Sequence, residues 1–250
     1  MDIKRCFWGW RFPAVMLAVA AIWYLNSRRF AMDEDVLGIF FDTSVRSTVT
    51  YLSLVVCHAA YGLSVCEELQ DHELIQILGR ISIKKYCMSK IVVCIFSNVS
   101  VYLTGTFLYL IYELTQHPLV LEEGYALQDI KNVTTFSWML PEYTVFFLFL
   151  QCLVSGICCS CMSVFAVALS VYIRDGFIVL CLPLILFFLF MFFSGNILKL
   201  SVDTECMFQI VTASEPEGFF LLRIVAFAVA CYLISGVILY LGSCRRKCYA

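Results

Sequence analysis

Long apolar runs separated by short polar segments recur along the whole chain. A membrane-spanning helix needs about 20 apolar residues, because the hydrocarbon core of a bilayer is about 30 Å thick. Windows that approach this length cover residues 12–25, 48–65, 91–112, 143–172, 177–193 and 219–242. The pattern therefore predicts six membrane spans, of which the first is short and the fourth is long.

These windows are continuously apolar and do not alternate between apolar and polar residues. A segment in lipid has to satisfy its backbone hydrogen bonds within the protein, so it forms either a helix or a strand of a closed barrel. Barrel strands alternate apolar and polar side chains, which these windows lack. The sequence predicts an all-α, polytopic membrane protein in which residues 1–250 form a single transmembrane domain.

Composition agrees with this interpretation and limits the possible functions. The chain is 62% hydrophobic and 14% charged, whereas soluble domains carry about 25% charged residues. No loop has room for a nucleotide-binding domain of about 100 residues, and no phosphate-binding Gly-x-x-x-x-Gly-Lys-Ser/Thr motif is present. We expect a non-enzymatic chain with no metal, cofactor or nucleic acid, whose energy source, if it needs one, is another chain or an ion gradient.

The distribution of basic residues predicts the orientation. Cytoplasmic segments of membrane proteins are enriched in Lys and Arg. If the N-terminus is cytoplasmic, six spans place 11 of the 17 basic residues in cytoplasmic segments: Lys4, Arg5, Arg11, Arg80, Lys84, Lys85, Lys90, Arg174, Arg245, Arg246 and Lys247. We therefore expect a multi-pass protein of the cell membrane with both termini in the cytoplasm.

The fourth window contains a cysteine cluster and a ladder of mostly small residues. Cys158 and Cys159 point about 100° apart on a helix, and no His or carboxylate lies near them in sequence, so we interpret them and Cys161 as packing residues and not as metal ligands. The ladder repeats every four residues and allows close approach of another helix, either of this chain or of a second copy: Cys152, Gly156, Ser160, Val164 and Ala168.

His58 is the one ionisable side chain that the sequence places well inside a predicted span. Such groups are costly in lipid and often functional, but His58 has only Asn98 and Gln151 as polar companions in other windows. We interpret His58 as a packed, hydrogen-bonded residue. A proton relay is the alternative.

The charged segment 67–90 lies between the second and third windows. Its apolar residues fall at i, i+3, i+4 and i+7 and form one stripe on a helix: Leu74, Ile77, Leu78 and Ile81. Gly79 weakens this helix near its end, and Ser82 is a suitable N-cap for a second short helix. The pattern predicts a cytoplasmic hairpin of two helices.

Two interpretations of this hairpin remain open. It could rest in the lipid head groups, where Lys84, Lys85 and Lys90 meet anionic lipid. It could instead dock its apolar stripe into a groove of a cytoplasmic partner.

The acidic end of the second window, the stripe, the motif Leu78-Gly79-x-x-Ser82-x-Lys84-Lys85-Tyr86 and Lys90 resemble the membrane (permease) subunit of type 2 ATP-binding-cassette (ABC) exporters. The order of six spans, with a tight basic turn between the fourth and fifth, is also similar to that family. The resemblance implies that the segment between spans two and three is a coupling helix.

The same resemblance implies the partners and the site. Two permease chains would pair, as a homodimer or heterodimer, and each would bind a separate ABC ATPase that holds ATP and Mg. The apolar windows, which hold few polar residues, favour a hydrophobic or amphipathic cargo. Residues that would contact the ATPase are Glu67, Glu68, Leu74, Ile77, Leu78, Ile81, Arg174 and Asp175.

Two other functions remain as alternatives. A gradient-driven transporter or channel would require a functional charge in the membrane, for which His58 is the candidate. A non-transporting membrane scaffold or immunity protein would need a docking surface but no movement coupled to ATP.

Overall fold

The computed structural model describes residues 6–30, 35–46, 48–71, 73–121, 125–173, 175–193 and 217–248. This part of the chain is helical and contains no strand, so the predicted all-α class is confirmed. In chain order the elements are α2 (Arg11–Ser27), α3 (Val36–Arg46), α4 (Val49–Ala59), α5 (Ser64–Gln70), α6 (Glu73–Arg80), α7 (Ile83–Glu113), α8 (Tyr125–Val133), the 3-10 turn η1 (Ser137–Met139), α9 (Thr144–Ser170), α10 (Gly176–Phe192) and α12 (Glu217–Cys248).

Three of the described helices, α7, α9 and α12, are long and apolar enough to cross a membrane. The predicted second span is broken, because α4 and α5 are bent by 44° and would count as a fourth span only if taken together. The predicted first and fifth spans correspond to α2 and α10, which have 17 residues each. A helix of that length measures about 26 Å, short of the bilayer core, and the prediction of six spans is not confirmed.

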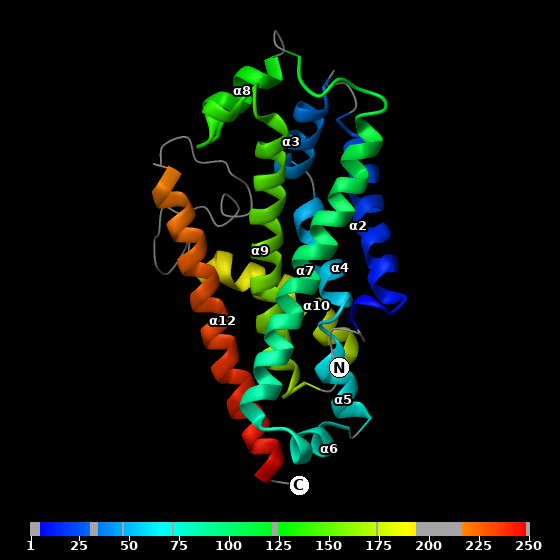
Figure 1. Cartoon of the computed structure of the whole chain (residues 1–250), viewed down its shortest axis with the longest axis vertical. Helices are drawn as coiled ribbons and strands as arrows, with labels where there is room; N and C mark the ends of the chain where they lie inside the picture. The colour runs from blue at the N-terminus through cyan, green and yellow to red at the C-terminus, as the bar shows by residue number, and fades with distance from the viewer. Residues whose placement is uncertain are drawn as a thin grey trace.

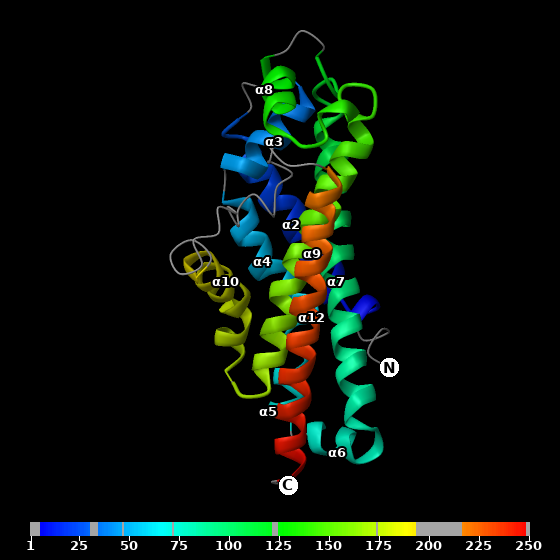
Figure 2. The ribbon, with the colours of Figure 1, turned by 90° about the vertical axis from the view of Figure 1, so that its left-hand side faces the viewer.

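The helices form an elongated bundle around α9 (Figures 1 and 2). α9 packs against α7, α12, α10 and α4, and 78% of its apolar window is buried, compared with 28% for α12. α3 and α8 lie at one end of the bundle, and α5, α6 and the end of α12 lie at the other (Figure 1). We call these the α8 end and the α6 end.

Small residues set the closest helix contacts. A Cβ atom on Gly105 of α7 would lie 2.7 Å from the Cβ of Val19 and 2.9 Å from the carbonyl oxygen of Met16, both in α2. A Cβ atom on Gly156 of α9 would lie 3.6 Å from the Cα of Val99 in α7. Backbones that approach this closely gain packing contacts along their length, which is how helices associate in lipid.

The small-residue ladder of α9 is buried within this chain. Gly156 faces α7, and the hydroxyl groups of Ser160 and Tyr232 lie 2.6 Å apart and link α9 to α12. The hydroxyl of Ser163 donates to Asn98 of α7 at 2.9 Å, so these interior polar groups satisfy each other. The ladder was expected to pack against a helix of this chain or of a second copy. In the structure it packs against helices of the same chain.

Aromatic stacking joins α2, α3 and α7 nearer the α8 end. The Trp23 ring lies 4.9 Å from that of Phe40 at an interplanar angle of 2°, and 5.5 Å from that of Tyr109. Rings that are buried and offset add to the area they remove from solvent. Together with the Gly105 contact, this stack fixes α2 against α7.

The contact at Gly105 leads to a stability prediction. Gly105→Ala should destabilise the protein by about 1–3 kcal/mol, because the added methyl group collides with α2. Gly79→Ala in α6 is the matched control, since no atom lies within 4 Å of a Cβ there and alanine favours the helix by about 1 kcal/mol. Thermal unfolding in mild detergent measures both, and equal midpoints for the two variants would contradict the packing described.

Candidate functional site

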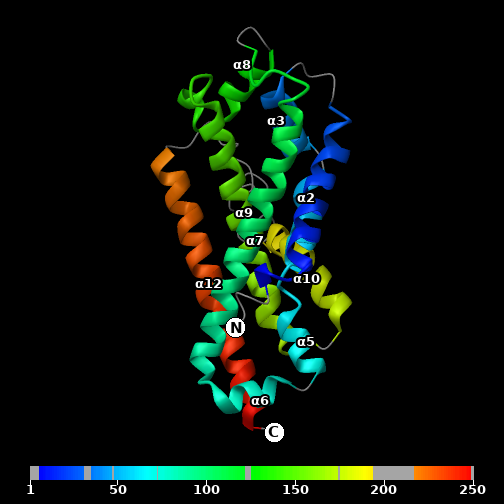
Figure 3. The ribbon, with the colours of Figure 1, turned by 45° about the vertical axis from the view of Figure 1, so that its right-hand side comes forward.

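The segment predicted as a cytoplasmic hairpin lies at the α6 end of the bundle. α6 crosses beneath the long helices and contacts α5 and α12 (Figures 1 and 3). The break after the first helix is at Ile81 and Ser82, but the second helix is not short: it continues as α7 for 31 residues. Ser82 occupies the N-cap position with extended backbone, yet its side chain makes no capping hydrogen bond.

The apolar stripe of α6 is divided between the core and the surface. Leu74 is 1% exposed and belongs to a buried cluster that includes Tyr61, Val65 and Tyr86, against which Ile77 also packs. Ile81 is 46% exposed. Leu78 lies in α6, but its side chain falls outside the described part of the structure. Among the described stripe residues, Ile81 is therefore the one open to a partner.

Glu68 forms a buried ion pair with Lys90, which joins α5 to α7. Their side chains are 2% and 1% exposed, and Lys90 Nζ lies 2.5 Å from Glu68 Oε1. The Tyr86 hydroxyl donates to Glu68 Oε2 at 2.8 Å, and Lys90 Nζ lies 5.3 Å from the centre of the Tyr61 ring. Burial of two charges costs several kcal/mol and is offset only by good pairing and further hydrogen bonds, which this cluster supplies.

In the head-group interpretation Lys90 would meet anionic lipid, and that part of the interpretation is wrong because its ammonium group is buried. Lys84 and Lys85 are exposed. The signal was present in the sequence: Tyr86 and Lys90 are four residues apart and share the buried face of α7 with Cys94. The pairing of this face with Glu68 was not predicted.

Glu67 faces a different neighbour from Glu68, because adjacent residues on a helix point about 100° apart. Its Oε1 lies 2.5 Å from Nη1 of Arg11, the first residue of α2. Both side chains are partly exposed, and such pairs contribute about 0–1 kcal/mol. The two neighbouring carboxylates thus bind α5 to α2 and to α7, and Glu68 is not accessible to a partner in this conformation.

The turn between α9 and α10 lies at the same end of the bundle. The thiol of Cys66 in α5 donates to the carbonyl of Ile173 at 3.9 Å, which places this turn against α5. Asp175 is exposed and caps α10, where it accepts hydrogen bonds from the backbone N–H groups of Phe177 and Ile178 at 2.8 and 3.2 Å. Arg174 lies outside the described residues. The structure thus brings Asp175 to the same end as Glu67 and Ile81.

His58 lies at the bend between α4 and α5 and is completely buried. A Cβ atom on Gly62 would lie 2.0 Å from His58 Cε1, so the ring packs directly on the glycine one turn later. The backbone of Val179 in α10 lies near the ring, but neither ring nitrogen makes a hydrogen bond of normal geometry. The expected packing is present, and the expected hydrogen bond is not.

The three clustered cysteines of α9 are buried in the core as reduced thiols. Within the described residues, no group of three or more His, Cys, Asp or Glu side chains is placed to hold a metal ion.

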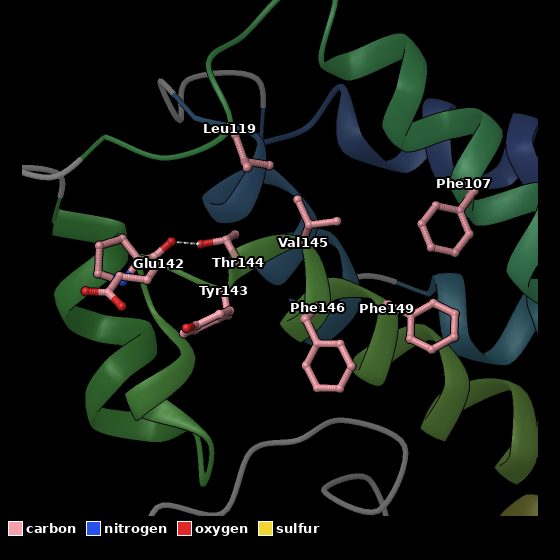
Figure 4. Close-up of a pocket in the computed structure, with 9 residues that line it drawn as sticks. Phe107, Leu119, Glu142, Tyr143, Thr144, Val145, Phe146 and Phe149 are labelled. Carbon is pink, nitrogen blue, oxygen red and sulfur yellow. Dashed lines mark hydrogen bonds between the residues drawn. The ribbon is translucent and has the colours of Figure 1, made fainter.

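A cavity of about 460 Å³ lies at the α8 end, between α7 and the start of α9 (Figure 4). Phe107, Phe146 and Phe149 form its apolar side, and Glu142 and Tyr143 lie at its other side, near the loop (Figure 4). The Thr144 hydroxyl donates to the Pro141 carbonyl at 2.7 Å and fixes the start of α9. This cavity was not predicted, because its wall comes largely from two helices whose relative rotation the sequence does not reveal.

Comparison of the chain with protein-family models, with curated proteins and with solved structures gave no significant match.

The buried pair leads to a stability prediction. Lys90→Met alone and Glu68→Leu alone should each destabilise the protein by about 3–5 kcal/mol, because each leaves one uncompensated buried charge. The double variant should recover much of that loss. Thermal unfolding in detergent compares the three.

Glu67→Gln is the control for loss of a partly exposed carboxylate and should cost less than about 1 kcal/mol. Two results would show that Glu68 and Lys90 are not coupled. Either single variant could lose no more stability than Glu67→Gln, or the double variant could lose as much stability as the two single variants combined.

Proposed function

We propose that the chain is the permease subunit of an ABC exporter and moves a hydrophobic or amphipathic substrate with ATP hydrolysed by a separate ATPase chain. The observation that carries this proposal is the position of α6. It is an amphipathic helix at the end of the bundle and is joined to the 31-residue α7 by a two-residue break. Such an element suits the transfer of movement from a partner to the membrane helices.

The length of α7 supports a position of α6 outside the hydrocarbon core. Its 31 residues measure about 46 Å, whereas the core is about 30 Å thick. The first turns carry Lys84 and Lys85, which are exposed and favour the polar side of the interface. α6 then lies where a soluble protein reaches it.

The buried pair gives α6 a mechanical connection to the bundle. α6 contacts α5, and α5 is fixed to α7 through Glu68 and Lys90. α7 in turn packs along α9 and α2. A partner that displaces α6 would therefore displace the start of α7 as well, and the change would reach the two helices packed on it.

The exposed side chains near the break define the docking surface. Ile81 is the apolar contact, and Arg80, Lys84 and Lys85 surround it with positive charge. An ATPase that binds here would present an apolar groove with an acidic rim. Glu67 of α5 is partly exposed and Asp175 is exposed at the turn that lies against α5, while Leu74 and Glu68 are buried.

The outer faces of α10 and α12 are apolar and exposed, and a second permease chain could pack against them. Large apolar side chains of α12 are exposed along its length, among them Leu222, Val225, Val229 and Leu233. In a membrane this surface contacts lipid or another permease. We propose a complex of two permease chains with two ATPase chains. The ATPase would supply the energy, since no loop of this chain has room for a nucleotide-binding domain.

One observation favours a scaffold or immunity protein as the second candidate. Leu74 and Ile77 pack into the core of the same chain, which leaves a docking surface narrower than the whole stripe. A scaffold needs only such a static contact. A gradient-driven transporter has less support, because neither ring nitrogen of His58 bonds to a carboxylate among the described residues and the ring packs directly against Gly62.

Introduction of a negative charge at Ile81 tests the proposal. Ile81→Asp should reduce co-purification of the ATPase at least tenfold, because an unpaired charge in an apolar groove costs several kcal/mol and each 1.4 kcal/mol is a tenfold loss. Gln76→Asp is the matched control, since it adds the same charge at an exposed polar site of α6. Export of cargo should fall in parallel.

Equal ATPase recovery with both variants would contradict the docking surface. If the unsubstituted chain recovers no ATPase in any nucleotide state, the permease proposal fails and a scaffold remains. If His58→Ala abolishes transport while Ile81→Asp does not, the protein is a gradient-driven transporter.

A further inference from the structure

A second cavity, of about 300 Å³, lies at the α6 end and differs in chemistry from the one at the α8 end. Its lining is Tyr172, Gly242, Arg245 and Arg246. It therefore combines two guanidinium groups with a phenol, and no carboxylate is among its described lining residues. It lies between the last turns of α12 and the turn that follows α9.

Close packing of these two segments shapes the cavity. A Cβ atom on Gly242 would lie 2.9 Å from Val171 Cγ1 and 3.1 Å from the Tyr172 hydroxyl oxygen, so glycine is required for α12 to approach. Nη2 of Arg246 donates to the Val171 carbonyl at 3.1 Å, and Nε lies 3.4 Å from the same oxygen. This contact holds the Nε and Nη2 edge of the guanidinium group against Val171, and the Arg246 side chain also lines the cavity.

The position of the cavity along α12 matches the edge of a membrane. The spanning helix Gly218–Arg246 contains an apolar window long enough for a bilayer, and Arg245 and Arg246 follow its apolar residues at this end. Tyr172 is exposed, and tyrosine is enriched at the level of the lipid head groups. Basic cavities between spanning helices at this level are suited to anionic head groups.

An apolar track leads away from the cavity along the same helix. Leu241, Val237 and Leu233 are exposed and follow one another at four-residue spacing, and Arg245 comes one turn after Leu241. Acyl chains attached to a head group in the cavity would lie along this track. A free anion would bind the arginines but would make no contact with this apolar track.

We propose that this cavity binds the phosphate head group of an anionic phospholipid from the surrounding membrane. Guanidinium groups bind phosphate oxygens through paired, charge-assisted hydrogen bonds. The Tyr172 hydroxyl supplies a further donor. The bound lipid would join the end of α12 to the turn after α9, next to α5, and so add to the rigidity of the α6 end. This inference does not depend on the proposed transport function.

Native mass spectrometry of the full chain in nonionic detergent tests the proposal with two lipids of equal acyl chains, dioleoylphosphatidylglycerol and dioleoylphosphatidylcholine. The unsubstituted chain should retain phosphatidylglycerol at least tenfold better. Arg246→Gln should remove this preference, and Arg246→Lys should restore part of it, because lysine keeps the charge but not the paired donors. Tyr172→Phe should weaken retention several-fold without the loss of a charge.

Lys84→Gln and Lys85→Gln are the matched controls, since each removes one exposed positive charge at the same end of the bundle. They should change retention less than twofold. The proposal is overturned if these controls reduce retention as much as Arg246→Gln, if both lipids are retained equally, or if millimolar inorganic phosphate displaces the lipid. The last result would assign the cavity to a free anion.

Discussion

The ion pair between Glu68 and Lys90 is the interaction on which the arrangement of the α6 end depends. It lies between α5 and α7, where both charges are almost completely removed from solvent. Two charges are retained in such a place only if each satisfies the other, so the pair fixes the relative position of the two helices closely. α6 connects these two helices in the chain, so their relative position also determines where α6 lies.

The rest of the bundle depends on small residues, since lipid gives helices little hydrophobic reason to associate. Gly105 lets α2 reach α7, Gly156 brings α9 to α7, and Gly242 brings α12 to the turn after α9. Polar side chains such as Asn98 and Ser163 bond to each other across these contacts. The α6 end is therefore attached to a closely packed bundle, which allows a force applied there to reach the membrane helices.

The features that were predicted correctly are those that depend on composition and on the periodicity of apolar residues. The all-α class, the three longest apolar windows and the helix with Leu74 and Ile77 on one apolar face all follow from local apolar patterns. The 44° bend after Ala59 was not predicted, because residues 60–63 are no more polar than the helices on either side. Nor was the continuity of α7, since Lys84 and Lys85 interrupt the apolar run without ending the helix.

The described residues that were predicted to contact a partner are divided between the surface and the core. Ile81 is exposed as a docking residue should be, whereas Glu68 and Leu74 are buried. Spacing along one helix gives the relative directions of its side chains but not which direction faces the bundle. Only the packing of α5 on α7 reveals that Glu68 meets Lys90, 22 residues later.

The central claim is that the surface around Ile81 binds an ATPase. The most direct measurement places a photoreactive amino acid at position 81 in living cells and identifies what becomes cross-linked on illumination. The account predicts a covalent adduct with an ATP-hydrolysing protein. Cross-linking to lipid alone, or to a protein without ATPase activity, would contradict it.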